Sequence, residues 1–85
     1  MPWRLEFKAS AKKELQQLDR KAQERVAAAI RDLIEAPRPV GVKALRGVSG
    51  HFRIRVGDYR VVYELLEGAL IIVIVRVAHR REVYR

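Results

Sequence analysis

The chain has 85 residues, no cysteine and a formal net charge of +8 at pH 7, and 49% of its residues are apolar. This length predicts a single domain over residues 1–85, and the lack of cysteine excludes a disulfide framework and a thiolate metal site. Two histidines alone form no recognisable zinc or iron site, so no cofactor is expected. The positive charge favours a polyanionic partner, nucleic acid before an acidic protein or an anionic membrane, over charge that serves solubility alone.

The location of the protein is predicted from what the sequence lacks. The N-terminal stretch MPWRLEF does not show the basic-then-apolar pattern of a signal peptide. The longest apolar run, from Ala69 to Val75, is too short to span a bilayer and is predicted to be a buried strand. We therefore expect a cytoplasmic protein without a membrane partner.

The first half of the chain predicts one strand and two helices. Apolar residues alternate with charged ones over residues 3–7, which is typical of a half-buried strand. Ser10 is predicted to cap a short helix, and Asp19 a second helix that ends at about Ala36, before Pro37. The apolar stripes predict that this helix pair covers one face of a sheet, with its charges in solvent.

The second half predicts a loop and three strands. Residues 36–50 are rich in proline and glycine, as loops are, and the strands are expected over about Phe52–Val56, Tyr59–Leu65 and Ala69–Val77. The predicted fold class is α+β, with an N-terminal strand and a two-helix hairpin packed on a largely antiparallel, about four-stranded twisted sheet.

Arginines are concentrated in the first predicted hairpin. A two-residue type II′ turn at Gly57-Asp58 places Arg55 opposite Arg60, with Arg53 two residues along on the same face. Like charges directly opposite each other cost about 0.2–1 kcal/mol in a sheet. Folding does not explain this cost, whereas a cationic surface for phosphates does. The alternative is that Glu64 and solvent relieve the repulsion and the arginines only keep the face hydrated.

The register of the last strand depends on the length of the next loop. A two-residue turn at Glu67-Gly68 predicts that Val75 lies opposite Arg60 and that Val77 shares the arginine face. A longer loop would shift this register. The last strand is apolar on both faces, which predicts a central position in the sheet.

Three segments resemble the RelE/ParE toxin superfamily of type II toxin–antitoxin systems, and specifically its RelE side. They are KALRG at 43–47, FRIRVGDYRVVYEL at 52–65 and VRVAHRREVY at 75–84. The resemblance implies a toxin that inhibits translation: a metal-independent, ribosome-dependent endoribonuclease that cuts mRNA in the ribosomal A site. It also implies a cognate acidic antitoxin, and binding to operator DNA only through the toxin–antitoxin complex.

The resemblance also implies which residues act. Matching the motifs places the catalytic roles on Arg53, Arg55, Arg60, Arg80 and Tyr84. The paired strand positions are often lysines in the family, and an arginine there stabilises charge but does not transfer protons, because guanidinium stays protonated. The tail between Arg80 and Tyr84 is about two residues shorter than in the family pattern, which affects how far Tyr84 reaches.

The proton acceptor has two candidates. Crowded cations can lower the pKa of a phenol, which favours Tyr84 as the general base. Imidazole is the side chain that ordinarily titrates near neutrality, so His79 is the alternative. Lys43, Arg46 and Arg81 are predicted to contact the RNA backbone without a chemical role.

Two other functions remain open from the sequence. A ParE-like inhibitor of DNA gyrase would share the fold and lack nuclease activity. A non-catalytic module would bind RNA or an acidic protein with strong salt dependence and never cut RNA.

Overall fold

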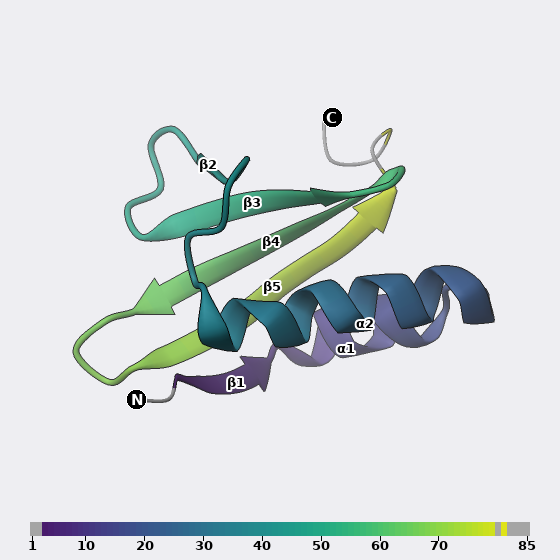
Figure 1. The fold of residues 1–85 in the computed structure, drawn as a ribbon, viewed down its shortest axis with the longest axis horizontal. Coiled ribbons are helices and arrows are strands. Elements are labelled where there is room, and N and C mark those ends of the chain that lie inside the picture. The colour runs from purple at the N-terminus through teal and green to yellow at the C-terminus, as the bar shows by residue number, and fades with distance from the viewer. Residues whose placement is uncertain (1–2, 80, 82–85) are drawn as a thin grey trace.

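The computed structural model describes residues 3–79 and 81. Its elements are β1 (Arg4–Phe7), α1 (Ala9–Gln16), α2 (Arg20–Glu35), β2 (Lys43–Ala44), β3 (His51–Val56), β4 (Tyr59–Leu66) and β5 (Ile71–His79) (Figure 1). The five strands form one sheet in the order β1-β5-β4-β3-β2, in which β1 runs parallel to β5 and all other pairs are antiparallel. The α+β class is confirmed, and the additional strand, β2, lies within the predicted loop. No helix in the described part of the chain is long and apolar enough to cross a membrane.

The two helices begin in different ways. Asp19 caps α2 as predicted, because its side chain accepts a hydrogen bond of 2.8 Å from the N–H of Ala22. The prediction that Ser10 caps α1 is wrong. The N–H of Lys8 still donates to the carbonyl of Ile74 in β5, at 2.9 Å, and α1 begins at the next residue without a side-chain cap.

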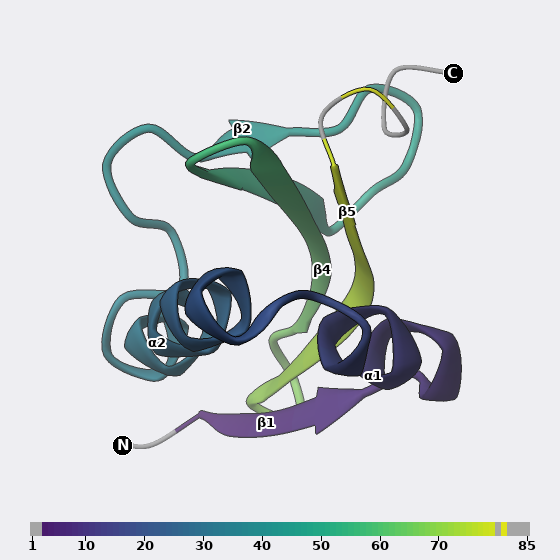
Figure 2. The same cartoon turned by 90° about the vertical axis from the view of Figure 1, so that its right-hand side faces the viewer.

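The core lies between the helices and one face of the sheet. α1 and α2 lie side by side, with α1 against β5 (Figure 2). The buried residues come from both helices and from β3, β4 and β5, and they include Ala11, Val26, Ile30, Leu33, Ile54, Val61, Tyr63, Ile72 and Ile74. This face of the β3–β4 hairpin is the one that the sequence predicts for the helices. The arginines therefore alternate onto the other face.

The β4–β5 connection differs from the prediction. Leu66 pairs with Ile71, so the loop contains four residues rather than two, and Leu70 has a φ of 56°. The register then shifts between Val62 and Tyr63, where β5 carries one extra residue. Arg60 consequently lies opposite Ala78, not Val75, and Val77 moves to the helix side, where it is 2% exposed.

A side chain of α1 contacts the edge of β5 at residues that β1 does not reach. One carboxylate oxygen of Glu14 accepts a hydrogen bond of 2.8 Å from the N–H of Val77, and the other lies 3.6 Å from the Arg76 guanidinium. The first contact satisfies a backbone donor on a strand edge that β1 leaves uncovered at this point. The last residues of β5, from which the tail continues, are thereby fixed to α1.

Candidate active site

The β3–β4 turn sets the positions of the arginines. Gly57 has a φ of 59° and Asp58 is not in the positive-φ region, as a type II′ turn requires. Arg55 pairs directly with Arg60, and Arg53 with Val62, which confirms the predicted register. The three arginines differ in exposure, however. Arg55 is exposed, Arg53 is half-buried and Arg60 is only 5% exposed, so Arg60 contributes little area to the predicted cationic surface.

A cleft of about 550 Å³ gathers these arginines with Lys43 of β2. Four consecutive residues of β3, from Arg53 to Val56, line it, although their side chains alternate between the two faces of the sheet. The cleft therefore meets β3 along its edge, beyond the point where β2 pairs with Arg53. We call it the edge cleft.

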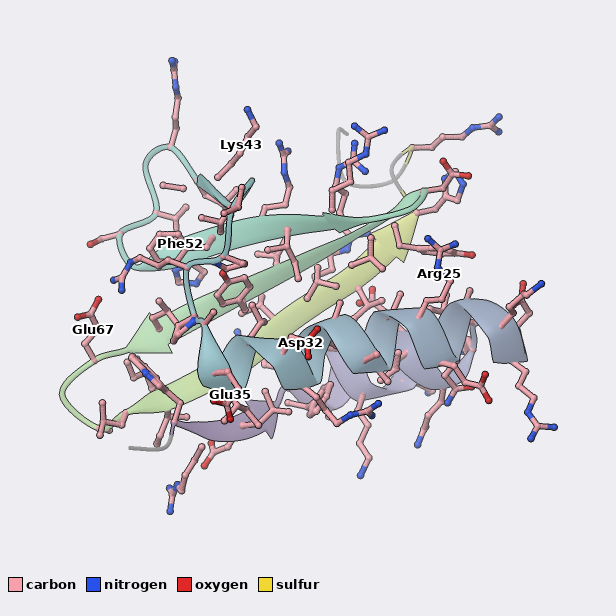
Figure 3. The ribbon with its side chains drawn as sticks, viewed as in Figure 1. Arg25, Asp32, Glu35, Lys43, Phe52 and Glu67 are labelled. Atoms are coloured by element: carbon pink, nitrogen blue, oxygen red, sulfur yellow. The ribbon has the colours of Figure 1, made fainter. Side chains whose placement is uncertain are left out.

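The opposite wall of the edge cleft comes from α2 and the loop that follows it. Ala29, Asp32 and Leu33 line the cleft from one side of α2, and Ala36, the first residue after the helix, continues the same wall. Figure 3 shows Asp32 and Glu35 on different sides of α2, and only Asp32 lines the cleft. Among the described residues that line the edge cleft, Asp32 is the only acidic one. The cleft thus combines apolar walls, four cations and one carboxylate.

Contacts with the sheet hold the loop after α2 in place. The buried Tyr63 hydroxyl donates a hydrogen bond of 2.6 Å to the Pro37 carbonyl. The Arg38 guanidinium lies 5.2 Å from the centre of the Phe52 ring and forms an ion pair with Glu67. Burial raises the pKa of Tyr63 to about 12, and the positive charge of Arg38 opposes this rise.

The raised pKa of Tyr63 predicts a loss of stability at high pH. A phenol whose folded-state pKa lies above its ordinary value of about 10 stabilises the fold below pH 10, and this contribution is lost as the pH rises toward 12. We expect the difference in free energy of unfolding between the wild type and Tyr63→Phe to shrink over that interval, by on the order of 2 kcal/mol. Denaturant unfolding of both proteins from pH 7 to pH 12 measures this difference. If the stability difference between the two proteins stays constant over this pH range, the pKa of Tyr63 is not raised in the folded protein.

The tail residues lie apart from the edge cleft or outside the described residues. His79 pairs with Tyr59, and their rings make an edge-to-face contact at 5.5 Å. Both residues line a separate cleft of about 350 Å³ with Glu14 of α1. The structure therefore does not bring His79 into the edge cleft. Arg80 and Tyr84 fall outside the described residues.

The predicted RNA contacts also occupy different places. Lys43 lines the edge cleft, whereas Arg46 is exposed in the loop between β2 and β3. Arg81 is exposed, and its backbone N–H donates to Nδ1 of His79 at 3.3 Å. Of the three, only Lys43 joins the arginines.

The chemistry available in the edge cleft is electrostatic. Guanidinium and ammonium groups bind phosphate oxygens and stabilise negative charge, and a guanidinium does not accept a proton. The described residues that line the cleft include no histidine and no tyrosine. A phenol or an imidazole that accepts a proton would therefore come from outside these lining residues.

The α2 wall is not predicted by the sequence. The prediction that the helix charges lie in solvent does not distinguish Asp32 from its neighbours. The available signal was the spacing of Ala29, Asp32, Leu33 and Ala36, which continues an apolar helix face with one carboxylate in it. That the loop after α2 folds beside this face is not visible in the sequence.

The sequence and the structure are both similar to known toxins. Residues 5–84 match the family described as the ParE toxin of the type II toxin–antitoxin system parDE. Toxin RelG of Mycobacterium tuberculosis is 34% identical over 86 residues, which cover 100% of this chain and 99% of RelG.

The fold is also similar to those of toxins in solved structures. The toxin–antitoxin complex RelBE2 of Mycobacterium tuberculosis contains a chain with a TM-score of 0.81 and 30% identity, over 94% of this chain and 100% of that one. An isolated Escherichia coli RelE toxin has a TM-score of 0.81 and 27% identity, over 96% of this chain and 90% of that one.

Proposed function

This chain belongs to the RelE/ParE toxin family of type II toxin–antitoxin systems, and we propose that it is a ribosome-dependent endoribonuclease that cuts mRNA in the A site. The observation that supports this proposal is the direct pairing of Arg55 with Arg60 beside the edge cleft. Like charges that lie directly opposite each other in a sheet repel, and a phosphate attracts both of them.

Cleavage of RNA without a metal requires three things of the protein. The 2′-hydroxyl must lose a proton, the negative charge of the pentacoordinate phosphorus must be stabilised, and the 5′-oxygen must gain a proton. Arg53, Arg55 and Arg60 are assigned to the second requirement. We assign the first to Tyr84 rather than His79, because His79 packs against Tyr59 and lines another cleft. Arg80 is assigned to the leaving-group oxygen.

The partner that silences this activity is proposed to be a cognate acidic antitoxin. Several of the similar solved structures are toxin–antitoxin complexes, and a net charge of +8 favours an acidic protein partner. The complex, not the toxin alone, is proposed to bind operator DNA.

Induction of the chain without its antitoxin tests the proposal. Sequencing of mRNA 5′ ends from translating ribosomes is expected to show new ends inside A-site codons, and mRNA that is not being translated is expected to stay intact. Intact mRNA on ribosomes, in cells whose growth is arrested, would contradict the proposed activity.

A second candidate function comes from the family description. Because the matching family is described by the ParE toxin, inhibition of DNA gyrase is the alternative. Its signature is inhibited supercoiling and DNA damage with intact mRNA, so the same induced cells distinguish the two functions.

A further inference from the structure

We propose that the edge cleft binds one base of the substrate RNA, next to the phosphate that is cut, and that Asp32 selects bases with an amino group. This inference rests on the proposed nuclease function. The supporting observation is that the edge cleft places the Asp32 carboxylate, on an apolar wall, across from a wall that contains the paired arginines Arg55 and Arg60.

The location follows from the arginines. A phosphate held by Arg55 and Arg60 lies at the β3–β4 side of the edge cleft, because both residues line it. The base attached to a neighbouring ribose is then within reach of the rest of the cleft, which extends under the edge of β3 to α2. An unstacked base is what proteins recognise in single-stranded RNA.

The size and the lining suit a base. A volume of about 550 Å³ lies within the range of about 300–1,000 Å³ for small-ligand sites. Ala29 and Ala36 on one side and Val56 on the other are at least partly exposed, and they offer aliphatic surface to the faces of a planar ring. A cleft that bound only the phosphate backbone would not need this apolar surface.

Asp32 is the residue that gives the cleft a preference. A carboxylate repels phosphate, so its presence among four cations opposes backbone binding and requires another role. Within the described part of the chain, the Asp32 carboxylate takes part in no ion pair and is exposed in the cleft. Ionised carboxylates only accept hydrogen bonds, and the amino groups of cytosine, adenine and guanine donate them. Uracil has no amino group, and its N3–H donor lies between two carbonyl oxygens that a carboxylate repels.

Three variants test the proposal in the induced cells described above. Asp32→Asn replaces one acceptor by a donor without changing the shape of the side chain. Ala36→Leu adds bulk at an exposed position on the cleft wall, so it fills the cleft without disturbing the core. Glu35→Gln removes the same charge as Asp32→Asn from a residue that does not line the cleft, and it is the matched control (Figure 3).

The readout is the base composition at each position around the cut. For the wild type and Glu35→Gln we expect one fixed position at which amino-bearing bases exceed uracil by about fivefold or more, after correction for mRNA composition. Asp32→Asn is expected to reduce this preference to less than about twofold, and Ala36→Leu to reduce cleavage itself. Cleavage with a base preference that neither variant changes overturns the base site and leaves the proposed function intact.

Two further results are also informative. Variants that leave the base preference unchanged and weaken binding of the antitoxin, measured with the purified complex, would show that a protein segment occupies the cleft, which overturns the proposal. Absence of cleavage by the wild type overturns the proposed function itself.

Discussion

Replacement of Arg60 by methionine is expected to lower the rate of mRNA cleavage by about 10²–10³, the usual effect of removing one group that stabilises the transition state. The fold is expected to survive this change. Arg60 is only 5% exposed, so the variant loses both the desolvation cost of the guanidinium and the interaction that Arg60 makes, and these two effects oppose each other. We therefore expect the free energy of unfolding to stay within about 2 kcal/mol of the wild-type value. Denaturant unfolding and 5′-end mapping measure the two quantities on the same protein.

Arg60→Lys is the matched variant, because it keeps the charge and loses the planar fork of donors. We expect its cleavage rate to lie between those of the wild type and Arg60→Met. Full cleavage by Arg60→Met would remove Arg60 from the active site. If Arg60→Met unfolded while Arg60→Lys stayed folded, the positive charge at this position would instead be required for the stability of the fold.

The parts of the fold that depend on local sequence were predictable. The Gly57-Asp58 turn fixes the β3–β4 register because loop length determines which residues pair, and Asp19 caps α2 because its carboxylate reaches the N–H of Ala22. The β4–β5 register was not predictable in the same way. It depends on a loop of four residues and on an extra residue in β5. Near that residue, the Val77 N–H donates a hydrogen bond to Glu14, which lies 63 positions earlier in the chain.

The candidate site likewise has one part that local sequence predicts and another part that depends on contacts between distant residues. The facing arginines follow from alternation within one hairpin, so the sequence alone predicts that they share a face. The edge cleft requires the loop after α2 to fold against β3, and the contact between Tyr63 and Pro37 that holds it joins residues 26 positions apart. Sequence patterns describe one element at a time, and for that reason Asp32 could not be placed opposite the arginines. The burial of Arg60 is likewise a property of the folded chain.

Replacement of Arg55 by glutamate is expected to separate stability from activity. The new carboxylate would lie directly opposite Arg60, and exchanging a like-charge pair for an opposite-charge pair is expected to raise the free energy of unfolding, by about 0.5 kcal/mol because Arg55 is exposed. Cleavage is expected to fall by at least about 10², because the glutamate repels the phosphate and partly neutralises Arg60 opposite it. Urea unfolding and 5′-end mapping measure the two effects.

The control must lower the net charge equally without touching the edge cleft. Arg31→Glu does this, because Arg31 is exposed on α2 and does not line that cleft. Arg31→Glu is expected to keep its cleavage rate within about threefold of the wild type at physiological salt, since screening limits the reach of a distant surface charge to about 8 Å. Suppose that Arg55→Glu is more stable but inactive, while Arg31→Glu stays active. The arginine pair would then be retained for phosphate binding at the expense of stability. If Arg55→Glu lost stability, or if both variants lost activity equally, the pair would have a structural role or act only through net charge.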